Sequence, residues 1–239
     1  MNRIAGFLWT TLAAASLAAS PLPAAAAKNA PATVDNPVAQ VRNARSWEYG
    51  PFVNWGNGIG TRSNYHFFAA GFQAGKILTP VLHLGRLSGQ FEYAVNLMPF
   101  WQAYTPSPYT QTVTKDNVTT VEQFGGGTFT GASLTPAIFR WNFLTRSRRI
   151  QPWFQAAGGL IYTTHKFPPA QLVPHGMPGG TSVFNFSPQG GVGIHYFVRP
   201  HRSLDLVVIG EHISSASLGD KNPGVNSSIQ VQLGYTFWK

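Results

Sequence analysis

A histidine and a serine two residues apart, His212 and Ser214, stand near the end of the sequence between two strand-like segments, residues 204–209 and 229–237. Residues two apart in an extended strand share a face, so both side chains are expected on the apolar face of their strand. A hydroxyl beside an imidazole base is the arrangement that activates a serine nucleophile. The pair therefore predicts acyl-transfer chemistry on an apolar surface, with a lipid ester as substrate.

Residues 1–27 have the pattern of a secretory signal peptide. Arg3 supplies the positive start, residues 4–17 form the apolar stretch, and three alanines ending at Ala27 offer a small-residue cleavage site. A retained membrane anchor is the alternative, which the shortness of the apolar run disfavours. The protein is therefore expected to be exported, with cleavage near Ala27.

The composition is that of an outer-membrane barrel. Of the 239 residues only 10% are charged and 13% are aromatic, with 25 glycines, 18 prolines and no cysteine. A lipid-facing surface excludes charge, and its rims collect aromatic side chains. After the signal peptide no apolar run approaches the roughly 20 residues of a membrane helix. A closed barrel can still span a membrane, because closure pairs every backbone group.

Residues 28–45 lack periodicity and are expected to form a flexible lead to a barrel domain at 46–239. Strand candidates follow at 46–55, 65–78, 87–104, 131–143, 151–164, 182–198, 203–213 and 228–238. Their connections alternate between long and short. The sequence therefore predicts an all-β fold, an eight-stranded antiparallel up-and-down transmembrane β-barrel of the outer membrane.

A soluble calycin-like barrel is the alternative fold, and it requires an apolar interior. The inner face of the last strand would carry Gln230, Gln232, Gly234 and Thr236, which suits a polar interior and a lipid-facing exterior.

The formal net charge of +9 could indicate nucleic acid, but the only basic cluster is Arg146–Arg149, and export argues against such a partner. The anionic partner expected in an outer membrane is lipopolysaccharide.

The residues around the pair also resemble a known family. The pattern His-x-Ser-x-Ala from His212, then Asn-x-Gly from Asn222, then a polar residue fourteen after the histidine, resembles the lipid A 3-O-deacylase (PagL) family. These eight-stranded outer-membrane barrels hydrolyse an ester-linked acyl chain of lipid A. The resemblance implies that His212 is the general base, Ser214 the nucleophile and Asn222 an oxyanion donor. Ser215 stands where the family often has Asn, and Asn226 where it has its acidic Glu.

Asn226 is a departure from that family pattern. An amide oxygen can orient the imidazole, but it carries no charge to stabilise the imidazolium. Weaker activity is therefore expected, or another acid, Asp220 or Glu211, and Asn226→Glu should raise the rate. Asn226 is an even number of residues from Gln230, whose side chain is expected to face the interior. The Asn226 side chain is therefore also expected to point inward, unless a bulge at 227–228 resets the register.

The sequence therefore predicts an outer-membrane serine esterase, a lipid A deacylase, whose site faces the outer leaflet. Lipid A is its expected partner, and no cofactor or metal is expected. A non-catalytic barrel that binds lipopolysaccharide, or acts as a surface adhesin, is the alternative from another functional class. The absence of the family's Glu at Asn226 favours that alternative.

Overall fold

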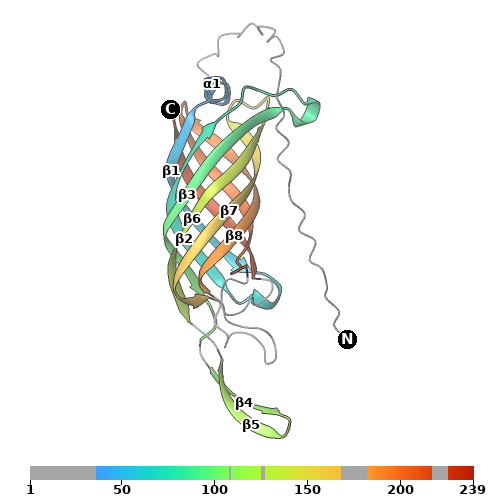
Figure 1. The fold of residues 1–239 in the computed structure, drawn as a ribbon. Coiled ribbons are helices and arrows are strands. Elements are labelled where there is room, and N and C mark those ends of the chain that lie inside the picture. The colour runs from blue at the N-terminus through green and yellow to red at the C-terminus, as the bar shows by residue number, and fades with distance from the viewer. Residues whose placement is uncertain (1–35, 108, 125–126, 168–181, 217–225) are drawn as a thin grey trace. The chain divides into compact units, whose positions relative to one another are not determined.

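The computed structural model describes residues 36–107, 109–124, 127–167, 182–216 and 226–239. The predicted signal peptide lies outside them. Within this part of the chain, eight strands close into an antiparallel barrel in the order β1-β10-β9-β8-β7-β6-β3-β2 (Figure 1). The barrel strands are β1 (Trp47–Gly58), β2 (His66–Ile77), β3 (Gly89–Tyr104), β6 (Thr128–Phe143), β7 (Ile150–Phe167), β8 (Ser182–Arg199), β9 (Arg202–His212) and β10 (Ser227–Trp238). Each corresponds to one predicted strand, so the predicted fold class is confirmed.

A separate hairpin lies between β3 and β6, in a region that the sequence analysis treated as a loop. It consists of β4 (Tyr109–Lys115) and β5 (Val118–Phe124), which pair only with each other among the described strands. Asp116 and Asn117 connect them, both with positive φ, at 50° and 61°. A two-residue turn with left-handed backbone at both positions matches the twist of the flanking strands, which explains the hairpin.

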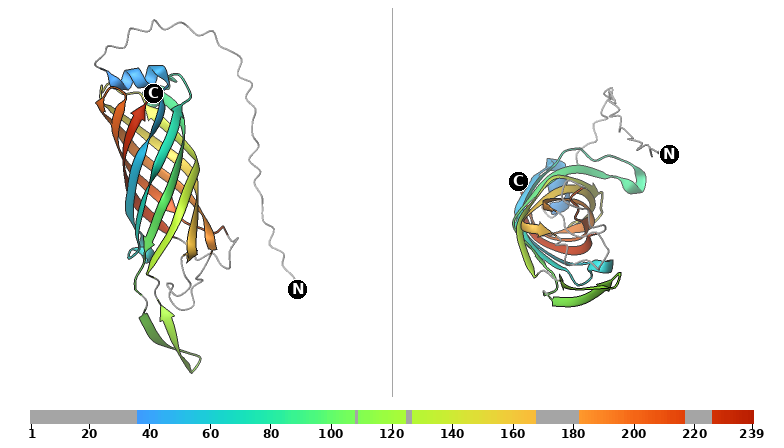
Figure 2. Two further views of the ribbon diagram at one scale, coloured as in Figure 1. Left: turned by 90° about the vertical axis from the view of Figure 1, so that its left-hand side faces the viewer. Right: turned by 60° about the horizontal axis from the view of Figure 1, so that its bottom comes forward.

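A short helix, α1 (Pro37–Ala44), forms where the sequence predicted a flexible lead, and it lies at one end of the barrel (Figure 2). Asn36 caps it by accepting a 3.0 Å hydrogen bond from the Ala39 amide. Val38 and Val41 are buried in a cluster with Ile77, Phe197 and Trp238. Packing on the barrel end stabilises a helix too short to be stable alone. Neither α1 nor the 3-10 turns η1 (Gly60–Arg62) and η2 (Gly85–Leu87) is long and apolar enough to cross a bilayer, and no other helix occurs in the described residues.

The two faces of the barrel wall differ in polarity. Large apolar side chains stand exposed on the outer face, among them Val53, Trp55, Phe72, Leu97, Leu134, Phe139, Phe154, Val192, Leu206, Val208, Ile229 and Leu233. On β10, Gln230, Gln232, Gly234 and Thr236 are buried towards the interior, as the alternation predicts. A calycin-like barrel would have the opposite arrangement. The outer surface is therefore suited to lipid.

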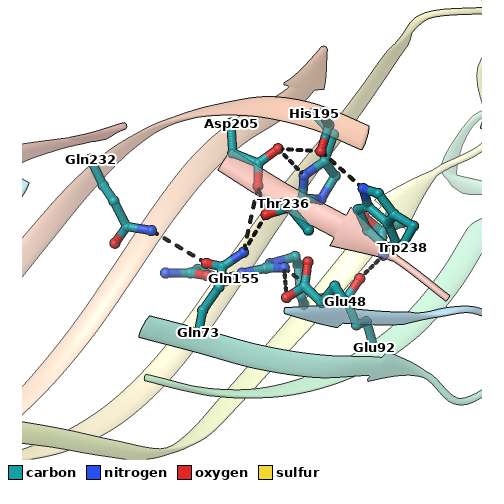
Figure 3. Close-up of polar contacts among 12 residues, drawn as sticks. Glu48, Gln73, Glu92, Gln155, His195, Asp205, Gln232, Thr236 and Trp238 are labelled. Carbon is teal, nitrogen blue, oxygen red and sulfur yellow. Dashed lines mark hydrogen bonds and ion pairs between the residues drawn. The ribbon is translucent and has the colours of Figure 1, made fainter. Parts of the chain in front are cut away.

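Charged side chains lie in the barrel interior, among them Glu48, the second residue of β1, and Glu92 (Figure 3). Arg140 donates hydrogen bonds to Glu48 at 2.7 Å and to Glu92 at 2.6 Å, and all three side chains are buried. The guanidinium also lies 4.3 Å from the centre of the Trp153 ring. Asn142 donates to the second oxygen of Glu92 at 2.6 Å. Buried charges are tolerated when they are paired and hydrogen-bonded in this way.

A second interior group is built on Asp205. Its carboxylate contacts His195 Nδ1 at 2.8 Å and accepts hydrogen bonds from Ser203 at 2.7 Å and from Thr236. The donor atoms of Glu48, Glu92 and His195 lie within 4.8 Å of one another, a spacing that could hold a metal ion. The Arg140 guanidinium already bonds both of these carboxylates. We therefore interpret the cluster as a structural ion-pair network.

At the other end the interior is closed by an aromatic cluster around Phe167. Its ring packs against Tyr65, Phe67, Trp101 and Phe129, with ring centres between 5.3 and 6.3 Å apart. Ile213 belongs to the same buried cluster. Side chains therefore occupy both ends and the middle of the barrel interior.

Candidate active site

The candidate site lies where β9 ends, at the barrel end opposite α1. His212 is the last residue of β9 and pairs with Ser227 on β10. Ser214 bridges to β8, since its amide donates to the Phe186 carbonyl at 2.9 Å and its carbonyl accepts from the Phe186 amide at 2.7 Å. This register places Pro188 beside His212. Proline has no N–H to donate, which explains why regular pairing of β9 stops there.

The alternation of faces continues through the end of β9. Glu211, Ile213 and Ser215 are buried towards the interior, whereas His212 and Ser214 are partly exposed on the outer face. The shared outward face of the pair follows the period-two pattern of the sequence. The structure therefore presents an imidazole and a hydroxyl to the surface that faces lipid.

The two side chains of the pair have separate partners. Ser214 Oγ accepts a 3.1 Å hydrogen bond from the Ala216 amide, and His212 Nδ1 lies 3.4 Å from Ser227 Oγ. No hydrogen bond joins His212 to Ser214, both of which the structure describes. Two residues along a strand span about 6.6 Å, so the imidazole has to lean towards Ser214 for proton transfer. Catalytic contacts often tighten only when substrate is bound.

Asn226 points away from the pair, into the barrel. Its Oδ1 accepts a 2.9 Å hydrogen bond from Arg62 Nε, and its Nδ2 donates to the Ile213 carbonyl at 3.3 Å. The register between β9 and β10 runs without interruption up to the pairing of Ser227 with His212. No bulge resets the faces, so the inward parity of Asn226 holds. The structure does not bring this side chain to His212.

The other predicted residues are placed as follows. Asn222 and Asp220 lie outside the described residues. Glu211 faces the interior, where Gln230 and Gln189 donate hydrogen bonds to its carboxylate, the latter at 3.2 Å. Ser227 was missed by the sequence analysis, although it contacts His212. Only the register of the final hairpin identifies it.

The outer surface beside the pair carries three exposed glycines. Gly158 on β7, Gly190 on β8 and Gly210 on β9 are all exposed; we call these three residues the glycine patch. Gly190 pairs with Gly210, and Gly158 pairs with Pro188. A Cβ atom added at Gly158 would meet nothing within 4 Å, and at Gly190 or Gly210 its nearest contact would be 4.0 or 3.8 Å away. The wall therefore carries no side chain at these three outward positions, one of which, Gly210, shares the outer face of β9 with His212.

The family model described as lipid A 3-O-deacylase (PagL) matches residues 39–236. Among solved structures, the outer membrane enzyme PagL is 13% identical, with a TM-score of 0.40, covering 79% of this chain and 98% of that one. Neisserial surface protein A is 14% identical, with a TM-score of 0.45, and covers 81% and 95%. The N-terminal β-barrel domain of Pseudomonas aeruginosa OprF is 13% identical, with a TM-score of 0.41, and covers 81% and 98%.

No curated protein matches the sequence. The family match spans nearly the whole described barrel, and it confirms the predicted resemblance to this family. The chain belongs to the lipid A 3-O-deacylase (PagL) family.

Proposed function

We propose that this protein is an outer-membrane serine esterase that removes an ester-linked acyl chain from lipid A, at a site facing the outer leaflet. The observation that carries the proposal is the His212 and Ser214 pair on the lipid-facing surface of a barrel of this family. A nucleophile on that face can reach an ester inside the leaflet, whereas one in the filled interior could not.

In the proposed mechanism, Ser214 Oγ attacks the ester carbonyl while His212 takes the hydroxyl proton. The tetrahedral intermediate collapses, and the alcohol oxygen of lipid A leaves with the proton from the imidazolium. Water, activated by the now neutral imidazole, then hydrolyses the acyl-serine and releases the fatty acid. Asn222 is the proposed donor to the oxyanion, and it lies outside the described residues. The reaction needs no electron transfer and no cofactor.

The glycine patch supports this placement of substrate. An acyl chain that lies along the barrel wall needs a surface free of side chains next to the nucleophile. Gly190 and Gly210 are paired on neighbouring strands and provide such a surface. Gly210 lies two residues before His212 on β9. Ile229 pairs with Gly210 from the other side and borders the patch with an apolar side chain.

The second candidate function, a non-catalytic barrel that binds lipopolysaccharide, is favoured by one observation. Where the family has its acidic Glu, this chain has Asn226, whose amide is hydrogen-bonded to Arg62 inside the barrel. Binding without hydrolysis would leave lipid A chemically unchanged, so analysis of lipid A separates the two functions.

Production of the full chain in a Gram-negative host is expected to alter that host's lipid A. The protein should be recovered in the outer-membrane fraction, with heat-modifiable migration on gels. Mass spectrometry of lipid A should show loss of one hydroxyacyl or acyl chain. Unchanged lipid A, in the presence of correctly folded barrel, would support the binding function. Recovery as a soluble periplasmic protein would contradict the membrane placement altogether.

Filling the glycine patch should slow turnover of lipid A. A leucine at Gly190 adds an apolar side chain where an added Cβ meets nothing closer than 4.0 Å, so Gly190→Leu should fold. One methylene in an apolar site is worth about 10- to 200-fold in discrimination, so a loss of about tenfold or more is expected on lipid A. Hydrolysis of a short water-soluble ester should change little.

The matched control is Ala74→Leu, on the outer face of β2, which adds a leucine to the wall away from His212. An equal loss of lipid A turnover in both variants would show that any added leucine on the outer wall slows the reaction, and that the glycine patch has no special role.

A further inference from the structure

Ser227 stands directly across from His212 on the outer face. In an antiparallel ladder, hydrogen-bonded and non-hydrogen-bonded pairs alternate, and side chains lie closer in the latter. The Ile213 amide donates to the Asn226 carbonyl at 2.9 Å, so the pair formed by those residues is of the hydrogen-bonded type. The next pair, His212 with Ser227, is therefore of the close type. The distance of 3.4 Å between His212 Nδ1 and Ser227 Oγ agrees with this.

The backbone of Ser227 is held from two sides. Its carbonyl accepts a 2.9 Å hydrogen bond from the Ile59 amide, just after β1. The preceding residue, Asn226, is bound by Arg62 Nε at 2.9 Å, and the Arg62 guanidinium also donates to Tyr65 at 2.9 Å. These contacts fix the start of β10 in position. A side chain on so restrained a backbone is suited to orienting a neighbour.

We propose that Ser227, and not Asn226, is the positioning residue that orients the His212 imidazole for the deacylation described above. The inference rests on the proposed function. Ser227 Oγ accepts a hydrogen bond from Nδ1–H and thereby holds the imidazole as the tautomer whose Nε2 lone pair is available to Ser214. The acid of a serine triad both orients the imidazole and stabilises the imidazolium that forms. The Ser227 hydroxyl carries no charge, so it can orient the ring but does not stabilise the imidazolium.

The remaining groups around His212 do not compete for this role. On β8 its neighbour is Pro188, which has no polar side chain. Glu211 is on the opposite face and is engaged by Gln189 and Gln230. Among the described residues, Ser227 is the polar side chain that shares a hydrogen bond with His212.

A matched pair of substitutions tests the inference by adding the same carboxylate on either face. Ser227→Asp places it beside His212, so it should stabilise the imidazolium and raise kcat by about tenfold or more. Asn226→Asp places it beside Arg62 inside the barrel and should give no such increase. Ser227→Ala should lower kcat about tenfold with little change in KM, and Ser227→Thr, which restores the hydroxyl, should recover most of the loss. A greater gain from Asn226→Asp, or a Ser227→Ala variant with wild-type kcat, would overturn the inference.

A spectroscopic measurement keeps the test independent of turnover. With ¹⁵N-labelled histidine in detergent-solubilised barrel, the His212 ring should report the Nδ1–H tautomer in wild type and lose that preference in Ser227→Ala. Heat-modifiable migration verifies that each variant is folded. Wild type that shows the expected tautomer but leaves lipid A intact would defeat the proposed function alone. A ring with the Nε2–H tautomer in wild type would defeat the positioning role alone.

Discussion

Ser214→Ala is expected to abolish release of the acyl chain, lowering the rate by about four to six orders of magnitude. The substitution removes the only atom proposed to form the acyl-enzyme. His212→Ala should cost a similar amount, since an unactivated hydroxyl is a poor nucleophile. The double variant should be no slower than either single variant, because nucleophile and base act as one unit. Deacylation of purified lipid A by equal amounts of folded barrel is the measurement.

The control for this series is Ser228→Ala. The Ser228 hydroxyl faces the interior, where it accepts a 2.9 Å hydrogen bond from Gln230 Nε2. The Ser228→Ala variant should therefore deacylate lipid A at nearly the wild-type rate. A Ser214→Ala protein with wild-type activity would remove Ser214 from the mechanism and require another nucleophile.

Arg140→Met is expected to lower the free energy of unfolding by about 3–5 kcal/mol, the usual cost of breaking a buried ion pair from one side. The substitution leaves the carboxylates of Glu48 and Glu92 inside the barrel without the guanidinium that contacts both at 2.7 and 2.6 Å. Urea unfolding of the barrel in detergent, followed by tryptophan fluorescence and gel migration, gives this quantity.

Two further variants define the cause of that loss. Adding Glu48→Gln and Glu92→Gln to Arg140→Met removes the unpaired charges and should restore much of the stability. Arg202→Met removes an exposed guanidinium, 5.5 Å from the Phe237 ring centre, and should cost less than about 1 kcal/mol. A similar loss in Arg140→Met and Arg202→Met would show that the interior network contributes little.

Local patterns in the sequence were enough to predict the barrel strands and the shared face of His212 and Ser214. Both depend on a period of two, which is set by the backbone itself. The β4–β5 hairpin and α1 were not predicted, because each is short. The hairpin depends on the left-handed pair Asp116 and Asn117, and the helix depends on packing against Trp238. Such tertiary support leaves little trace in the local sequence.

The partner of His212 shows why the rest of the site could not be predicted. Residues fourteen and fifteen positions after His212, just before and at the start of β10, are both polar, and they point to opposite faces of the barrel wall. A shift of one residue in register exchanges them. The register is fixed by contacts distant in sequence, such as the bond from Ile59 to Ser227 and the bond from Arg62 to Asn226. Spacing alone therefore identified the family's position but not the residue that touches the imidazole.

The position of Glu48 on β1 has a consequence for how the barrel assembles. β1 and β10 come from opposite ends of the barrel sequence and meet at the closing seam, where Trp47 and Lys239 exchange backbone hydrogen bonds of 2.7 and 2.9 Å. Glu48 lies over β2 on the interior side, where it pairs with Gly75, and Arg140 extends towards it from β6. The ion pairs of Arg140 therefore connect four neighbouring strands, β1, β2, β3 and β6, across their inner face. These contacts do not require the seam between β1 and β10, whose closure carries the larger entropic cost because it joins the two ends of the barrel sequence.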